Sequence, residues 1–388
     1  MLSALRHALA LSWRSLRHEP RKAAALTTAL WIAFSLPLLT WLSTQHLESS
    51  LFARSESTPI LLGSPGNDYD LALSSLYFRS RPRETLPIAT LTSIEAESPG
   101  LVVPIYLGHS LQGRPIVATS RSYFDVRGLT AESGRLPLQL GEIVVGAGVA
   151  RELRLEVGDR LRNDLTNLYD LSGAYPFLLE VVGILASTRS ADDDAVFTGL
   201  KTAWTLDGRM HGHDAVQPED ILGDENGTLE ASAAIFLFAE LNAQSRQSFH
   251  LHGDPDAAPI SALLVFPSSR KQHDLLLGSI ALRSDLQAIR PRKIVESVLE
   301  IVLRLQRLLG AGFLAIAVAM TLLVGTVLGL TARLRQRDLQ LFRELGASRA
   351  RVSAILGAEI VWVCCGALFA SGATATATYF LLHHLLPL

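Results

Sequence analysis

The chain has 388 residues and a formal net charge of −2, and 48% of its residues are hydrophobic against 19% charged. This apolar content exceeds what a soluble domain requires and indicates membrane-spanning segments. The near-zero net charge offers no overall basic surface, so no nucleic-acid partner is expected. The two cysteines, Cys364 and Cys365, are adjacent near the end of the chain and cannot staple a large domain.

Residues 1–22 predict a cytoplasmic amphipathic helix, whose apolar side carries Leu9, Trp13 and Leu16 while arginines occupy the other faces. Residues 23–43 follow without a charge and are long enough to cross a bilayer, which takes about 20 apolar helical residues. The preceding basic residues place the amino terminus inside. A cleaved signal peptide is the alternative, but no clear cleavage site follows the apolar run.

Residues 44–307 contain no further span and predict a folded extracytoplasmic domain. The string "GEIVVGAGVARELRLEVGDRL" and the later "FLLEVVGIL" predict a strand at 143–145, a helix at 147–153 and a buried strand at 177–185. The predicted fold class is a membrane protein, with an α-helical transmembrane bundle of three visible spans and a large α+β extracytoplasmic domain.

Two polar features of this domain are candidate metal ligands. The histidines form two His-x-His pairs, His211 with His213 and His250 with His252, each able to present two imidazoles to one Zn²⁺ in an extended segment. The alternative is that these are loop histidines that only face water. The acidic run 192–194 is interpreted as residues that cap or solvate a loop, with a calcium site as the alternative.

The carboxy-terminal part alternates apolar and basic segments. Residues 308–332 predict the second span, and 357–388 predict the third span with its outer end. Between them, residues 333–356 carry six arginines against two acidic residues, which marks a cytoplasmic loop. Gly346 would end one short helix there and Ser348 would cap another. The alternative is that this segment is an ordinary basic turn between two spans, which needs no partner protein.

This loop contains the string "LFRELGASRARVSAIL", which resembles the coupling segment of ABC transporter permeases of the MacB, LolC/LolE and FtsX class. The strand, helix and strand within 141–200 resemble the MacB-like periplasmic core domain of the same permeases. The resemblance implies that the loop contacts the ATPase. The matching residues are Arg343, Glu344, Leu345, Gly346, Ala347, Ser348, Arg349 and Arg351.

The resemblance implies a non-catalytic permease subunit that transmits ATP-driven movement to its outer domain, for export, lipoprotein release or mechanotransmission. No phosphate-binding loop occurs in the sequence, so ATP is expected on a separate ATPase and no cofactor in this chain, apart from a zinc ion at the histidine pairs. Expected partners are the ABC ATPase, a second permease copy or paralogue, membrane lipid and a periplasmic protein.

The expected location is the bacterial inner membrane, with the large domain outside the cytoplasm. Residues 293–332 are predicted to carry movement between that domain and the membrane. The resembled permeases generally have four spans, and the three predicted here depart from that pattern. The alternative function is an ATP-independent, membrane-anchored sensor or scaffold.

Overall fold

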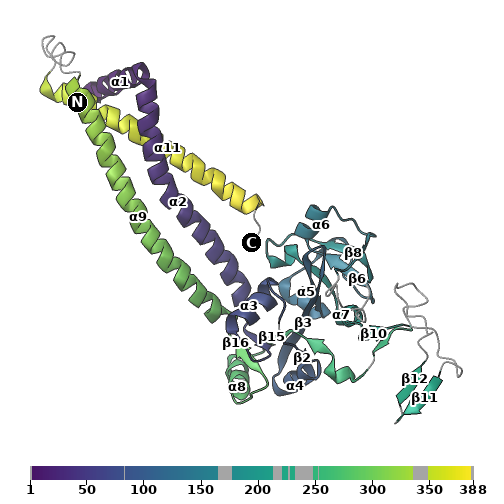
Figure 1. Ribbon diagram of the computed structural model, residues 1–388. Coiled ribbons are helices and arrows are strands. Elements are labelled where there is room, and N and C mark those ends of the chain that lie inside the picture. The colour runs from purple at the N-terminus through teal and green to yellow at the C-terminus, as the bar shows by residue number, and fades with distance from the viewer. Residues whose placement is uncertain are drawn as a thin grey trace. The chain divides into compact units, whose positions relative to one another are not determined.

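The structure is a computed structural model. It describes residues 2–82, 84–164, 177–212, 221–225, 228–231, 248–251, 253–334 and 348–385. The chain forms two compact units, which we call the helical unit (Met1–Ser49 and Val298–Leu386) and the sheet unit (Ser50–Ser297). The sheet unit is thus an insertion in the sequence of the helical unit. Both boundaries between the units fall inside long helices (Figure 1).

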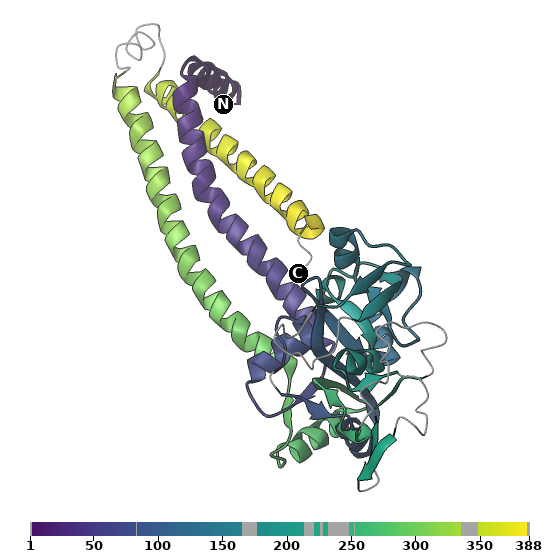
Figure 2. The same ribbon diagram turned by 45° about the vertical axis from the view of Figure 1, so that its right-hand side comes forward.

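The helical unit is built from α1 (Leu2–His18), α2 (Pro20–Glu56), α9 (Pro291–Leu334) and α11 (Arg349–Leu385), the long ones being visible in two views (Figures 1 and 2). In the described part of the chain, three helices are long and apolar enough to cross a membrane. Their candidate spans are Pro20–His46, Pro291–Thr331 and Ser353–Leu381. A helix suits this role because it satisfies its backbone hydrogen bonds internally.

Helix α11 begins directly after Ser348, as the predicted cap requires, but it does not stop at residue 356. The expected short helix is instead the first part of one continuous helix, because no proline interrupts the run.

A small apolar cluster joins α2, α9 and α11. Its buried members are Leu26, Leu30, Val324, Leu328, Val363 and Ala367.

The sheet unit is organised around one mixed sheet, which contains ten strands in the described part of the chain. The strand order is β16-β1-β15-β3-β4-β9-β6-β8-β5, with β7 paired to β8. The pairs β4·β9 and β6·β8 are parallel and the other neighbours are antiparallel. The strands are β1 (Ile60–Gly63), β3 (Gly100–Leu111), β4 (Arg114–Thr119), β5 (Ala131–Gly134), β6 (Glu142–Val145), β7 (Arg160–Arg162), β8 (Leu178–Leu185), β9 (Val196–Gly199), β15 (Ala262–Pro267) and β16 (Gln287–Ile289).

Three short antiparallel pairs lie outside this sheet. They are β2 (Leu86–Pro87) with β14 (Pro259–Ile260), β10 (Met210–His211) with β13 (His250–Leu251), and β11 (Ile221–Glu225) with β12 (Thr228–Ala231). The remaining helices are α3 (Asp68–Tyr77), α4 (Ala89–Glu97), α5 (Arg121–Arg127), α6 (Ala147–Leu153), α7 (Leu200–Leu206) and α8 (Arg270–Ile280), with the 3-10 helices η1 (Ala191–Asp194) and η4 (Pro255–Ala257).

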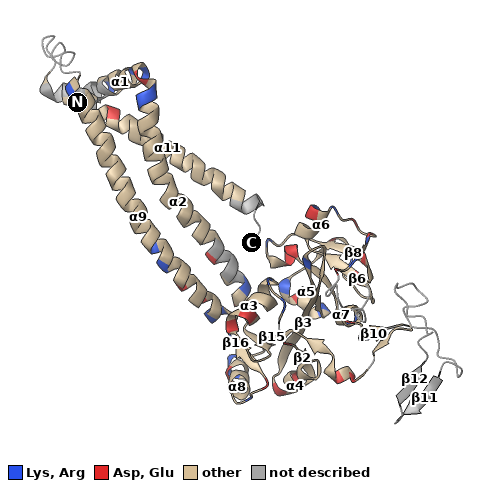
Figure 3. Cartoon of the chain, viewed as in Figure 1, with Lys and Arg blue, Asp and Glu red and all other residues tan. Residues whose placement is uncertain are grey.

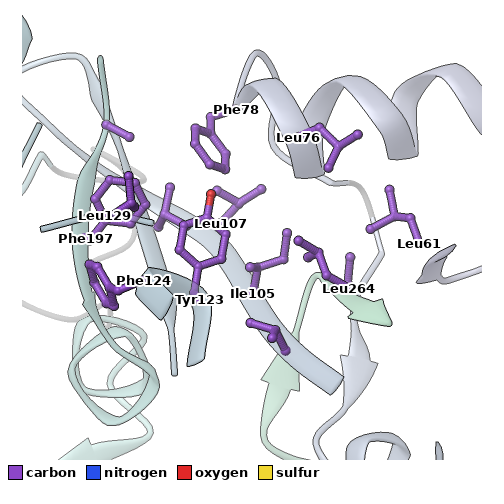
Figure 4. Close-up of a cluster of buried hydrophobic side chains, with 14 of the residues drawn as sticks. Leu61, Leu76, Phe78, Ile105, Leu107, Tyr123, Phe124, Leu129, Phe197 and Leu264 are labelled. Atoms are coloured by element: carbon purple, nitrogen blue, oxygen red, sulfur yellow. The ribbon is translucent and has the colours of Figure 1, made fainter. Parts of the chain in front are cut away.

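Alternating apolar residues give the sheet two buried faces, as the two-residue period of a strand requires. On β1, Leu61 joins a cluster with α3 and α5, whereas Ile60 and Leu62 join another with α4 and α8. Figure 4 shows the first cluster, in which Tyr123 and Phe197 pack together, their ring centroids 5.6 Å apart. The sheet unit therefore has a core of its own.

The predicted strand, helix and strand are present as β6, α6 and β8. Helix α6 starts after Gly146 and ends at Leu153, because the next residue, Arg154, has a left-handed backbone (φ 54°). Gly158 supplies the next turn with φ 102°, a conformation that favours glycine. The mixed sheet with helices confirms an α+β domain.

Candidate functional site

The predicted coupling residues lie partly within the described structure. Residues 343–347 lie outside it, while Ser348 is exposed and directly precedes α11. Arg349 and Arg351 fall in the first turn of that helix. The described part of the predicted coupling segment is therefore continuous with a candidate membrane span.

Helix α1 packs against α11. The indole rings of Trp13 and Trp362 lie 4.9 Å apart between centroids, and Trp362 Nε1 donates a hydrogen bond of 3.1 Å to the Leu9 carbonyl oxygen. Ser12 beside this contact is fully buried. Because these contacts come from α1 residues spaced along one face, the helix is braced on α11 as well as joined to α2.

A buried ion pair fixes the last turns of α2 within the sheet unit. Arg54 Nη1 donates to Asp192 Oδ2 at 2.6 Å and Nη2 donates to Asp192 Oδ1 at 3.1 Å. The Tyr123 hydroxyl donates to the same carboxylate at 2.7 Å and lies 3.1 Å from Arg54 Nη2. Arg54 Nε also donates to the Leu76 carbonyl oxygen. We call Arg54, Asp192 and Tyr123 the Arg54 clasp.

The clasp is closed to solvent, since the side chains of Arg54 and Asp192 are 6% and 3% exposed. Burial alone would lower the pKa of Arg54, but Tyr123 and Asp192 outweigh it and raise the pKa. Burial would likewise raise the pKa of Asp192, but Arg54 outweighs it and lowers the pKa. Both groups are therefore charged, in a bidentate geometry that aligns the two planar groups.

Further contacts hold the chain at the points where it enters and leaves the sheet unit. Arg127 at the end of α5 donates to Thr58 Oγ1 at 2.7 Å and to Ser57 Oγ, just beyond α2. Arg292 in the first turn of α9 lies 2.6 Å from Glu56, the last residue of α2. This second pair is half-exposed and contributes little energy, but it shows that the entry and exit points are neighbours.

The acidic run 192–194 caps a loop, as predicted. Asp193 accepts hydrogen bonds from the backbone amides of Thr188 and Arg189 at 2.8 and 3.0 Å, and from Ser187 Oγ at 2.6 Å. Asp192 is used by the clasp. In the described parts of the chain, no three His, Cys, Asp or Glu side chains are grouped as a metal site.

The structure describes one histidine of each predicted pair, His211 and His250. His213 and His252 lie outside the described residues. The register of β10 and β13 sets His211 directly opposite His250, although 36 or more residues separate the two pairs in sequence. His250 Nδ1 lies 2.8 Å from the Ser248 carbonyl oxygen, a contact of the kind that orients a ligating imidazole. Zinc binding stays a prediction.

The clasp residues were not among the predicted site residues. The sequence predicts for Asp192 only that it helps to cap or solvate a loop, and its partner Arg54 is 138 residues away. One local signal exists, an arginine in the last turn of a long, largely apolar helix, but such a residue is ordinarily solvated.

Comparison with known proteins finds a matching family model and similar solved structures. Residues 45–232 match the family model of the MacB-like periplasmic core domain. The periplasmic region of MacB from Actinobacillus actinomycetemcomitans aligns over 64% of this chain and 97% of its own, with 11% identity and a TM-score of 0.36. The extracellular domain of the noncanonic ABC-type transporter YknZ from Gram-positive bacteria aligns over 59% and 98%, with 12% identity and a TM-score of 0.33. No curated protein matches the sequence.

Proposed function

We propose that the chain is the permease subunit of an ABC transporter, because residues 45–232 match the family model of the MacB-like periplasmic core domain. The match confirms the resemblance to MacB-type permeases. Together with this match, three helices that are long and apolar enough to span a membrane in the described part of the chain support a membrane protein with an extracytoplasmic domain. We propose that it lies in the bacterial inner membrane. The residues before the first span are basic, as is typical of a segment on the cytoplasmic side of that membrane.

The observation that carries this proposal is the family match of a domain inserted between two candidate spans. The coupling string around Gly346 supports it on the other side of the membrane. An ATPase on a separate chain would push on the segment that leads into α11. Coupling of this kind requires a part of the protein that can adopt two conformations. ATP and ADP bound to the ATPase must favour these two conformations to different extents.

In this mechanism the Arg54 clasp has a definite part. If the end of α2 moved without the sheet unit, the Arg54 guanidinium would leave the Asp192 carboxylate unpaired in a buried site, which costs free energy. A displacement of α2 is therefore expected to move the sheet unit with it. The movement would therefore reach η1 and, through it, the neighbouring strand β9. The substrate and the direction of work stay open among export, lipoprotein release and mechanotransmission.

The test is co-purification of the full-length chain in detergent with the ATPase encoded beside it. Wild type is expected to retain the ATPase, whereas Gly346→Pro with Arg349→Glu is expected to lose it while keeping its helix content. Arg151→Glu on the exposed surface of α6 makes the same charge change and should retain the ATPase. If no ATPase associates with wild type, the sensor or scaffold function takes the lead.

A metal-linked role is a second candidate, favoured by the register that pairs His211 with His250. Zinc titration of the full-length chain tests it directly. Binding at micromolar zinc should weaken in His211→Ala with His250→Ala and persist in His273→Ala, which alters a histidine on α8. Binding that is absent, or unchanged by the double substitution, removes this candidate.

A further inference from the structure

Helix α1 has a second face that the contact with α11 does not use. The face toward α11 carries Leu9, Ser12 and Leu16, the last packing near the apolar cluster of the helical unit. Arg6, Arg14 and Arg17 are all exposed. At 100° per residue these three arginines fall within roughly a quarter of the helix circumference. They form a stripe along one side of α1.

The stripe is uniformly positive. Helix α1 contains no acidic residue, and Arg21, just beyond its end, is exposed as well. Figure 3 shows basic residues on α1 and at the start of α2, whereas the middle of α2 and of α11 is uncharged. An exposed positive stripe next to the start of a candidate span fits a layer of negative charge at the membrane surface.

The aromatic neighbours favour lipid over a soluble anion. Trp13 is 43% exposed, and the Arg17 guanidinium lies 5.2 Å from the centre of its ring. Tryptophan beside arginine is typical of the boundary where apolar chains meet head groups. Guanidinium groups bind phosphate oxygens in bidentate fashion, which lysine does not reproduce.

We propose that Arg6, Arg14 and Arg17 bind the phosphate groups of anionic phospholipids in the leaflet where α2 begins. The inference rests on the chain spanning a membrane, and it does not require the ATPase. Because α1 is braced on α11 through Trp13 and Trp362, lipid bound at the stripe also steadies the helix that follows the coupling segment.

The experiment measures lipid retained by the full-length chain alone, in neutral detergent doped with dioleoylphosphatidylglycerol or dioleoylphosphatidylcholine, by native mass spectrometry. Wild type is expected to prefer phosphatidylglycerol by at least about tenfold, given three cationic contacts. The variant Arg6→Gln, Arg14→Gln, Arg17→Gln should lose most of that preference. The corresponding lysine variant should keep part of it.

The control variant Arg121→Gln, Arg151→Gln, Arg154→Gln removes the same charge from exposed positions of the sheet unit and should behave as wild type. Equal retention of the two lipids by wild type overturns the proposal, and so does an undiminished preference in the α1 variant. If that variant keeps its lipid preference in this experiment but loses the ATPase in the co-purification described above, the stripe contacts protein instead. Loss of the ATPase by wild type would leave the lipid result unaffected, so the two proposals fail separately.

Discussion

Arg54 and Asp192 place opposite charges side by side in a site closed to water. In Arg54→Met the carboxylate would remain buried without its cation, which costs about 3–5 kcal/mol for pairs of this kind. Pulse proteolysis of the full-length chain in urea should report this loss from the sheet unit. Arg54→Met with Asp192→Leu should recover more than half of it, because no charge is left behind. A single variant as stable as Arg121→Met, an exposed control, would contradict the role given to the pair.

Glu142 makes the sheet unit sensitive to acid. Burial would raise its pKa, but hydrogen bonds from Arg135 and the amides of Leu138 and Gln139 outweigh it and hold the pKa at about 2, below the ordinary 4.5. The folded state therefore binds this proton less readily than the unfolded state. Its contribution, on the order of 2–3 kcal/mol, is complete above pH 4.5 and is lost as the pH falls toward 2.

The corresponding prediction concerns Glu142→Gln, which cannot ionise. Between pH 6 and pH 3 the urea midpoint of wild type should fall more steeply than that of the variant, although the variant is less stable at pH 6 because Arg135 loses its ionised partner. Parallel pH curves for the two proteins would show that Glu142 does not titrate in this way.

The junction of β6 and α6 depends on close backbone packing against η1. A Cβ at Gly146 would lie 2.3 Å from the Asp192 carbonyl oxygen and 2.4 Å from that of Asp193. Gly146→Ala should therefore displace η1 and cost about 1–3 kcal/mol, with the clasp loosened as well. Gly278→Ala on α8 meets nothing within 4 Å and should instead stabilise by up to about 1 kcal/mol. Similar urea midpoints for the two variants would refute the packing argument.

Local pattern was sufficient to predict β6, α6 and β8, because β-branched runs and glycine turns act over a few residues. The same reasoning missed that α2 continues to Glu56, since hydropathy marks where a span ends and not where a helix ends. It also missed the partner of Arg54, because pairing with Asp192 is created by the fold alone. The histidine register of β10 and β13 likewise depends on contacts that no single segment specifies.

If the proposed permease function holds, the nucleotide bound to the ATPase should change the conformation or dynamics of the sheet unit. Hydrogen exchange of the assembled complex, compared between ATP and ADP states, should differ at η1 and α5. There the clasp holds the end of α2, and Arg127 holds Thr58 just beyond it. In Arg54→Met with Asp192→Leu the ATPase should remain bound while this difference shrinks. An unchanged difference would mean that movement reaches the sheet unit by another route, such as α9.

The first and last strands of the sheet unit, β1 and β16, pair directly, with Leu61 opposite Ile289. Together with the Glu56 and Arg292 pair, this brings the two chain ends of the sheet unit to one place. A domain whose ends meet can be lengthened, shortened or replaced in a gene without altering the register of the helices that hold it. Related chains are therefore expected to vary most in sequence and length between residues 57 and 290, while the helices on either side of this region stay similar.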